Sequence, residues 1–295
     1  MSGLLERLRR GEDVVLGDGA VGTLLRGKGL GAGEPPESFN LTRPDVVEWA
    51  AAAYVDAGSE IVQTNTLGGN EIRLALFGLA DRADEIHRAA VAAARRGARG
   101  RALVAGTCGP TGLRLKPDGG ALRNLIRDAF ERQMAALLDS GVDMFIIETM
   151  TDLEEALVAL EAAREAAGDG FPVAVTMAFA PAESGFATAC GDRVEACASA
   201  LAAAGADIVG SNCGREPADM IGIAADFREH TDLPLLIQPS AGLPRMDGEE
   251  AVYPVGPDLL ARTAKELLKV GVSVLGGCCG TTPEHIRALR RVIDS

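Results

Sequence analysis

Short apolar segments alternate with longer helical patterns along the whole chain, and this alternation restricts the fold more than any other feature. Eight segments have the character of strands: 13–16, 60–64, 102–105, 144–147, 173–178, 207–209, 235–237 and 272–275. The segments between them place apolar residues at helical spacing, as in 153–160. Eight strand–helix units without a linker predict one closed (β/α)8 barrel, a TIM barrel, over residues 1–295. A doubly wound open sheet is the less consistent alternative, because its edge strands are usually more polar than these.

Capping patterns predict where some of the helices begin. Thr151 with Glu154, and Thr281 with Glu284, have the spacing of a capping box, so we expect each pair to open a helix. Residues 4–10 form a further short helical pattern. We expect this first helix to close the bottom of the barrel.

Polar and glycine-rich segments follow the strand-like segments and never precede them. They are 17–23, 63–70, 106–112, 148–149, 211–214, 238–244 and 276–280. In a (β/α)8 barrel the C-terminal ends of the strands share one face, and active sites are built there. The sequence therefore predicts a functional site on that face.

Three cysteines lie in two of these polar segments. Cys278 and Cys279 are adjacent in the turn 276–280, and Cys213 lies in 211–214. Three thiolates can hold a zinc ion tetrahedrally with one position open, which is a catalytic arrangement. A substrate thiol in that position would be held as a thiolate. A buried cysteine is also often no more than a small apolar side chain, and the spacing alone leaves both interpretations open.

Two carboxylates and the other cysteines complete the set of candidates. Asp18 follows the first strand and Glu148 the fourth, where each could bind an ammonium group by charge-assisted hydrogen bonds. Asp18 could instead cap the following helix. We expect Cys190 and Cys197 to lie on one helix and to pack, while Cys108 is either a pocket residue or simply buried at its strand end.

Composition narrows the partners and the location. The formal net charge of −13 argues against nucleic acid or an anionic membrane as a partner. Residues 1–10 are charged and lack the apolar stretch of a signal peptide, and no segment has the uninterrupted apolar length of a membrane span. We therefore expect a cytoplasmic protein whose six cysteines stay reduced, so a strained disulfide between adjacent cysteines is not expected.

Motifs along essentially the whole chain resemble the homocysteine S-methyltransferase family. They lie at 17–23, 36–45, 64–66, 109–112, 148–149, 212–213 and 276–286, and the last contains the run Gly-Gly-Cys-Cys-Gly-Thr-Thr-Pro. Within the family, the chain looks most like the homocysteine-binding module of the cobalamin-dependent methionine synthases. We expect none of the folate-binding, corrinoid-binding or reactivation modules of those synthases in this chain.

This resemblance implies a methyltransferase of the (β/α)8 type that makes methionine from homocysteine. Zinc would be held by Cys213, Cys278 and Cys279, with the homocysteine sulfur on the metal. The amino group of homocysteine would lie near Glu148 and Asp18. The other residues that we predict to bind substrate are Asn65, Thr107 and Asn212.

The methyl donor differs among members of the family. Betaine-using relatives typically place a tyrosine after the glutamate of strand four, and aromatic faces bind quaternary ammonium groups. Here Thr149 follows Glu148, the chain has only one Trp and two Tyr, and Tyr253 alone among these is expected to reach the barrel mouth. We therefore predict a methylcorrinoid donor, either methylcobalamin or a separate corrinoid protein docking over the mouth. S-methylmethionine and S-adenosylmethionine are the alternatives.

Two rival functions use the same residues. One is methyl transfer to another small thiol, and the other is a zinc-binding module without turnover. Asp18 and Glu148 argue against the second, because zinc storage needs no group that recognises an amine.

Overall fold

Eight parallel strands form one sheet that curves into a barrel in the computed structural model, which describes residues 2–11, 13–115, 120–214, 216–248 and 250–295. Along the sheet the strands are β1 Val15–Leu16, β12 Val274–Leu275, β9 Leu235–Pro239, β8 Ile208–Cys213, β5 Val173–Met177, β4 Met144–Met150, β3 Leu103–Cys108 and β2 Ile61–Gln63. The two ends of this order meet where Glu60, just before β2, donates its N–H to the Leu16 carbonyl at 2.7 Å. The predicted (β/α)8 barrel is confirmed, and the open sheet is excluded.

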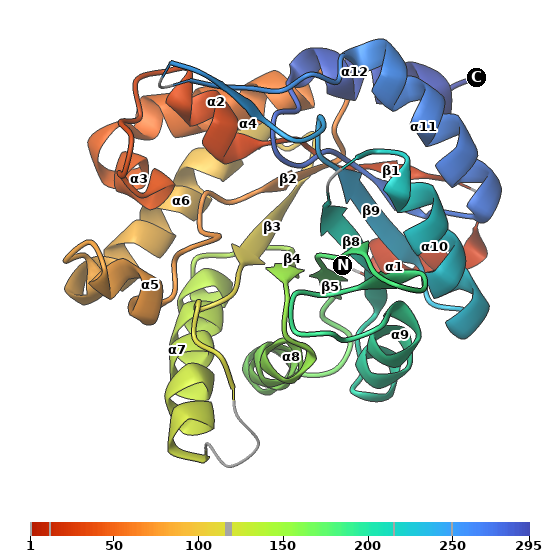
Figure 1. Cartoon of the computed structure of the whole chain (residues 1–295). Coiled ribbons are helices and arrows are strands. Elements are labelled where there is room, and N and C mark those ends of the chain that lie inside the picture. The colour runs from red at the N-terminus through yellow and green to blue at the C-terminus, as the bar shows by residue number, and fades with distance from the viewer. Residues whose placement is uncertain (1, 12, 116–119, 215, 249) are drawn as a thin grey trace.

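Helices connect the strands and surround the barrel (Figure 1). The outer ring contains α4 Pro44–Val55, α6 Ala83–Ala98, α7 Gly120–Asp139, α8 Leu153–Ala167, α9 Val194–Ala203, α10 Asp219–His230, α11 Pro257–Val270 and α12 Pro283–Ile293. Shorter helical turns are α2 Val21–Arg26, η1 Pro36–Ser38, α3 Phe39–Thr42, α5 Glu71–Ala75 and η2 Ala80–Arg82. Two hairpins enlarge the loops after β5 and β9: β6 Ala180–Pro181 with β7 Phe186–Ala187, and β10 Arg245–Asp247 with β11 Glu250–Val252. No helix in the described ranges combines the length and the apolar content needed to cross a membrane.

Helix α1, Ser2–Arg10, packs against the barrel interior as the sequence predicts. Its Leu5 and Leu8 are buried in one cluster with inward-facing strand residues, among them Ile61. The barrel wall is also tightly packed, since a Cβ at Gly210 in β8 would stand 1.9 Å from the carbonyl oxygen of Leu236 in β9. With its interior filled from the N-terminal side, the barrel presents its polar residues at the opposite end.

Four strands run further than the sequence predicts. The strands β3, β4, β8 and β9 end at Cys108, Met150, Cys213 and Pro239, whereas the apolar patterns stop at 105, 147, 209 and 237. Neighbouring parallel strands continue to pair with these polar ends. As a result the β3–β4 ladder sets the direction of Thr107, whereas Glu148 lies where β4 shifts its register against β5, between Ile147 and Met150.

The predicted start of α8 is wrong by one residue. Its N-cap is Asp152, whose side chain accepts the N–H of Glu154 at 3.0 Å. Thr151 belongs to the connection instead, and its carbonyl accepts the N–H of Cys190 at 3.3 Å. Cys190 was also wrongly placed on a helix: it lies in a turn before α9, closed by hydrogen bonds around Thr188.

The predicted start of α12 is likewise displaced by one residue. Thr282 is the N-cap, and it forms the capping box with His285. Thr281 is occupied elsewhere, because its hydroxyl accepts the N–H of Ala20 at 3.1 Å and donates to the carbonyl of Cys278 at 2.7 Å. A contact between distant loops thus displaces a local capping pattern.

Candidate active site

Three thiols converge at the C-terminal end of the barrel. Cys213 ends β8, and Cys278 and Cys279 lie in the turn between β12 and α12. The sulfur–sulfur distances are 3.5 Å for Cys213–Cys278, 3.6 Å for Cys213–Cys279 and 4.0 Å for Cys278–Cys279. A tetrahedral zinc ion with Zn–S bonds of ~2.3 Å holds its sulfurs ~3.8 Å apart. The donor atoms and their spacing therefore fit one metal ion bound by three cysteines.

Neighbouring loops hold these cysteines in place. Cys213 has a φ of +67°, a left-handed conformation that is uncommon for a residue with a side chain. The N–H of Cys278 donates to the carbonyl of Pro239, at the end of β9, at 2.9 Å. Gly277 is required beside it, because a Cβ there would lie 2.4 Å from the Thr281 hydroxyl. The turn is therefore shaped by tertiary contacts as well as by its glycines.

The three thiols also shift one another's pKa values. Hydrogen bonds from Cys213 and Cys278 lower the pKa of Cys279 well below the ordinary thiol value. Hydrogen bonding to the other two thiols raises the pKa of Cys278. One thiolate therefore forms readily, whereas three thiolates at this spacing repel one another and need a cation between them.

The remaining cysteines lie outside this cluster. Cys108 is fully buried, with its sulfur 3.5 Å from that of Met134, and burial raises its pKa. Cys197 is buried within α9. Cys190 contacts the Arg114 guanidinium at 3.4 Å.

Asn212 connects the cluster to the neighbouring strands. Its side-chain oxygen accepts the Thr149 N–H and the Thr176 hydroxyl, both at 2.8 Å. Its amide nitrogen donates to the Thr149 hydroxyl at 2.7 Å and lies 3.5 Å from both Glu148 Oε2 and Cys278 Sγ. These bonds hold Thr149 at a φ of +62°. Asn212 is completely buried behind the site and is not among the described residues that line its cavity.

Two buried carboxylates are joined through Gln63. The Gln63 N–H donates to Asp18 Oδ2 at 2.7 Å, and its side-chain amide donates to Glu148 Oε2 at 3.3 Å. Burial raises the pKa of Asp18 to about 8 and that of Glu148 to about 7, although the hydrogen bonds from Gln63 oppose the shift. Glu148 lines the same cavity as Cys278 and Cys279, whereas Asp18 borders a separate void of about 10 Å³ inside the barrel. Of the two, Glu148 is the one that a ligand beside the thiols can reach.

Thr107 and Asn65 both line the cavity but differ in what their side chains contact. The Thr107 hydroxyl is buried and has no hydrogen-bond partner among the described residues. The Asn65 amide donates to the Pro36 carbonyl at 2.7 Å and to Asn40 Oδ1 at 2.9 Å. Thr107 is therefore available to a ligand, whereas Asn65 anchors the segment 36–40 beside the cavity.

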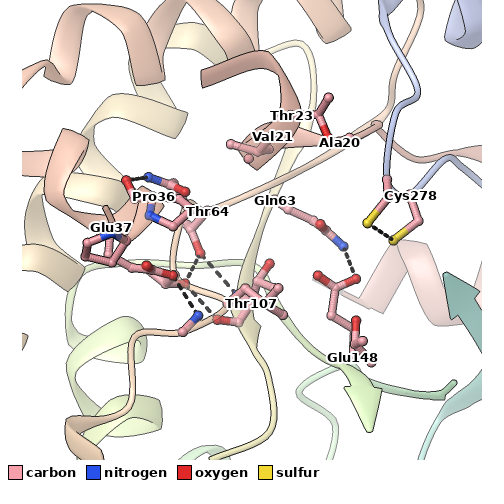
Figure 2. A pocket seen from close by; sticks show the side chains of 18 of the residues that line it. Ala20, Val21, Thr23, Pro36, Glu37, Gln63, Thr64, Thr107, Glu148 and Cys278 are labelled. Carbon is pink, nitrogen blue, oxygen red and sulfur yellow. Dashed lines mark hydrogen bonds between the residues drawn. The ribbon is translucent and has the colours of Figure 1, made fainter. Parts of the chain in front are cut away.

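Cys278, Cys279 and Glu148 line one cavity of about 520 Å³ (Figure 2). This volume is in the range of small-molecule sites, and the wall is mainly apolar, as such sites usually are. Phe77 is the one aromatic side chain among its described lining residues. Tyr253 lies close to the cluster but outside the lining, with its ring packed on Gly280.

Two lining residues, Gln63 and Glu37, were not predicted as site residues. Gln63 ends β2 at the start of a polar segment, which is a signal that the sequence does contain. Glu37 lies in η1, far from any strand end, and its burial depends on the loop after β2. The family motif at 36–45 contains Glu37, but no strand-end pattern marks it as a residue of the cavity wall.

At its C-terminal face the (β/α)8 barrel has three convergent cysteines that could hold a metal ion, beside a buried carboxylate that lines a cavity of small-molecule size. The chain belongs to the homocysteine S-methyltransferase family, whose family model, described as Homocysteine S-methyltransferase, matches residues 15–293. The predicted family is therefore confirmed.

Similar proteins include two mycobacterial methionine synthases. The chain is 34% identical to that of Mycobacterium leprae over 306 residues and 35% identical to that of Mycobacterium tuberculosis over 296 residues. These matches cover 98% and 95% of this chain, but only 25% and 24% of the relatives. The metallated homocysteine methyltransferase MmuM from Escherichia coli superimposes with a TM-score of 0.80 at 22% identity, covering 98% of this chain and 99% of that one. This last likeness shows the fold.

Proposed function

We propose that the chain catalyses zinc-dependent methyl transfer to the thiol of L-homocysteine, giving L-methionine. The observation that carries the proposal is that Cys278, Cys279 and the buried carboxylate of Glu148 line one cavity of small-molecule size, with the Cys213 sulfur beside the other two thiols. Membership of the family supports the same reaction class. Because the thiols must stay reduced, we also propose a cytoplasmic location.

The residues of the site divide the work of binding the acceptor. Zinc, bound by Cys213, Cys278 and Cys279, would keep the homocysteine sulfur deprotonated at neutral pH. Glu148 would bind the ammonium group. Burial has removed water from this carboxylate, and the ammonium group would supply a counter-charge in its place. The Asn212 side-chain amide contacts both Glu148 and Cys278 and so fixes the distance between them. The ammonium group and the sulfur of homocysteine would therefore be bound at a defined separation.

For the methyl donor we propose a methylcorrinoid, supplied as methylcobalamin or by a separate corrinoid protein. The motif resemblance to the cobalamin-dependent synthases supports this choice, as do the methionine synthases that the chain matches. Betaine fits less well, because a quaternary ammonium cage needs several aromatic faces. Phe77 is the one aromatic residue among the described residues that line the cavity. S-methylmethionine and S-adenosylmethionine are the second candidates, since a cavity of about 520 Å³ can admit a small sulfonium compound.

One experiment separates these functions from the rivals. Zinc-loaded protein is incubated with homocysteine, or with another small thiol, and with each donor in turn, and the methylated thiol is measured by mass spectrometry. We expect methionine from homocysteine and methylcobalamin. Faster transfer from betaine would overturn the donor, methylation of another thiol in preference to homocysteine would overturn the acceptor, and bound zinc without any transfer would support the binding module.

A further inference from the structure

The cavity contains polar groups that the acceptor site does not use. Figure 2 shows Cys278 and Glu148 on one side, Glu37 on the opposite side and Thr107 between them. All four residues line the same cavity of about 520 Å³. A small amino acid held by the thiols and Glu148 leaves much of this space to a second ligand.

Glu37 is a buried carboxylate on that far side. It is 3% exposed, and its Oε1 accepts the N–H of Gly68 at 2.7 Å. Burial raises its pKa, while its own backbone N–H, the Gly68 N–H and the charge of Arg73 act in the opposite direction. Among the described residues no cation forms a salt bridge with it. Keeping such a group buried costs free energy unless something pairs with it.

Thr107 contributes an unpartnered hydroxyl to the same cavity. Its N–H donates to the Thr64 hydroxyl at 3.1 Å, and its carbonyl accepts the Thr66 hydroxyl at 2.7 Å. The backbone is thus satisfied without the side chain, whose Oγ1 is buried and unpartnered in the described structure. Because Glu37 contacts Gly68 and Thr107 contacts Thr64 and Thr66, both residues are anchored to one loop, 64–68.

We propose that Glu37 and Thr107 form a second subsite that binds an N–H group of the methyl donor. The carboxylate accepts from the N–H group, and the hydroxyl adds a second hydrogen bond. The group is either the ammonium of an amino-acid sulfonium donor or a carboxamide of a corrinoid. This inference rests on the proposed function, since it divides the cavity into an acceptor end at the thiols and a donor end at Glu37.

The two sources predict different sensitivities to the charge of Glu37. In Glu37→Gln the side-chain oxygen still accepts from Gly68, so the loop keeps its anchor. An ammonium group would lose a charge-assisted bond, and we expect the donor KM to rise about 10- to 100-fold. A carboxamide would still find an oxygen acceptor, so the rise would be about two- to fivefold. Thr107→Val should raise the KM of either donor by about three- to tenfold.

The test measures donor and acceptor separately on zinc-loaded protein. Methyl transfer is followed with S-methylmethionine and with methylcobalamin, first varying the donor and then homocysteine, and homocysteine binding without donor is measured by calorimetry. We expect Glu37→Gln and Thr107→Val to raise the donor KM. The Kd for homocysteine should stay within about twofold of the wild-type value, which is less than the loss of one hydrogen bond would cause. Glu34→Gln is the matched control, because it removes an exposed carboxylate from the same cavity and should change neither.

An unchanged donor KM in both variants would overturn the subsite, as would equal weakening of homocysteine binding. Thermal unfolding of each variant confirms that the fold is intact. If the wild-type protein transfers methyl from neither donor, the proposed function fails, and direct calorimetric binding of the two donors then decides the subsite. Weaker donor binding by Glu37→Gln than by the wild-type protein would support the subsite. Equal donor binding by the two proteins, or no detectable donor binding, would overturn the subsite.

Discussion

Replacing Glu148 with Gln removes a charge and little else. The side chain is 7% exposed, and its Oε2 receives N–H groups from Gln63 at 3.3 Å and from Asn212 at 3.5 Å. A glutamine oxygen can accept both, so the strands and the thiol cluster should keep their positions. What the variant loses is the counter-charge for the ammonium group of homocysteine.

The size of the effect follows from the burial of this group. Truncating one partner of a buried, hydrogen-bonded charge pair costs about 2–5 kcal/mol. At ~1.4 kcal/mol per tenfold, the Kd for homocysteine should rise about 30- to 4,000-fold. Because burial raises the pKa of free Glu148 to about 7, part of the molecules carry its proton at pH 7 and must release it when an ammonium group binds. Proton release on homocysteine binding should therefore be smaller in the variant.

Calorimetry at pH 7 in two buffers of different ionisation enthalpy measures both quantities, and metal analysis checks that zinc is retained. The matched control is Glu155→Gln. Glu155 is a buried carboxylate that accepts from the Thr111 N–H at 2.7 Å and from the Thr111 hydroxyl at 2.6 Å, and it does not line the described cavity. The Glu155→Gln variant should alter neither the Kd for homocysteine nor the proton release on binding. Unchanged homocysteine binding by zinc-loaded Glu148→Gln would refute the assignment of the ammonium site.

Three further changes test the rest of the site. Cys278→Ser should lose the bound metal, about one zinc ion per chain, while Cys197→Ser keeps it; equal zinc content by elemental analysis would show that the ligands are wrongly chosen. Asn212→Ala should weaken zinc binding about 10- to 100-fold, as loss of a group that orients a ligand does, and should also raise the homocysteine KM; a change in only one of the two would contradict its bridging position. The folded protein holds a proton on Asp18 up to a pKa of about 8, whereas the unfolded chain releases it near 4. The free energy of unfolding of the metal-free protein should therefore fall by up to ~1.4 kcal/mol per pH unit between those values. Asp18→Asn should flatten this slope in urea titrations, and an unchanged slope would argue against a buried acid.

The sequence by itself determined the architecture and the position of the three thiols. The eight strands were predicted at their observed places, because buried parallel strands form apolar runs that differ in period from the helices between them. The thiols were predicted on one face, because in a parallel barrel every strand delivers its C-terminal end to the same side. Both conclusions depend on local patterns combined with one topological rule.

Only the tertiary structure decided the fine positions of polar residues. Thr281 did not cap α12, because its hydroxyl accepts the N–H of Ala20 from the loop after β1. The strands β3 and β8 continued past their apolar runs to Cys108 and Cys213, because neighbouring backbones pair there. In each case the competing partner is far away in the sequence, so no local pattern contains it.

The same holds for which side chains face the cavity. Asp18 and Asn212 stand at strand ends as predicted, yet closure of the barrel places Asp18 beside an internal void and Asn212 behind the thiols. Glu37 lines the cavity only because the loop after β2 reaches back to bind its carboxylate. Burial and orientation arise from packing between segments far apart in the chain, whereas periodicity is a property of neighbouring residues, and for that reason the sequence predicted the face of the barrel but not the walls of its pocket.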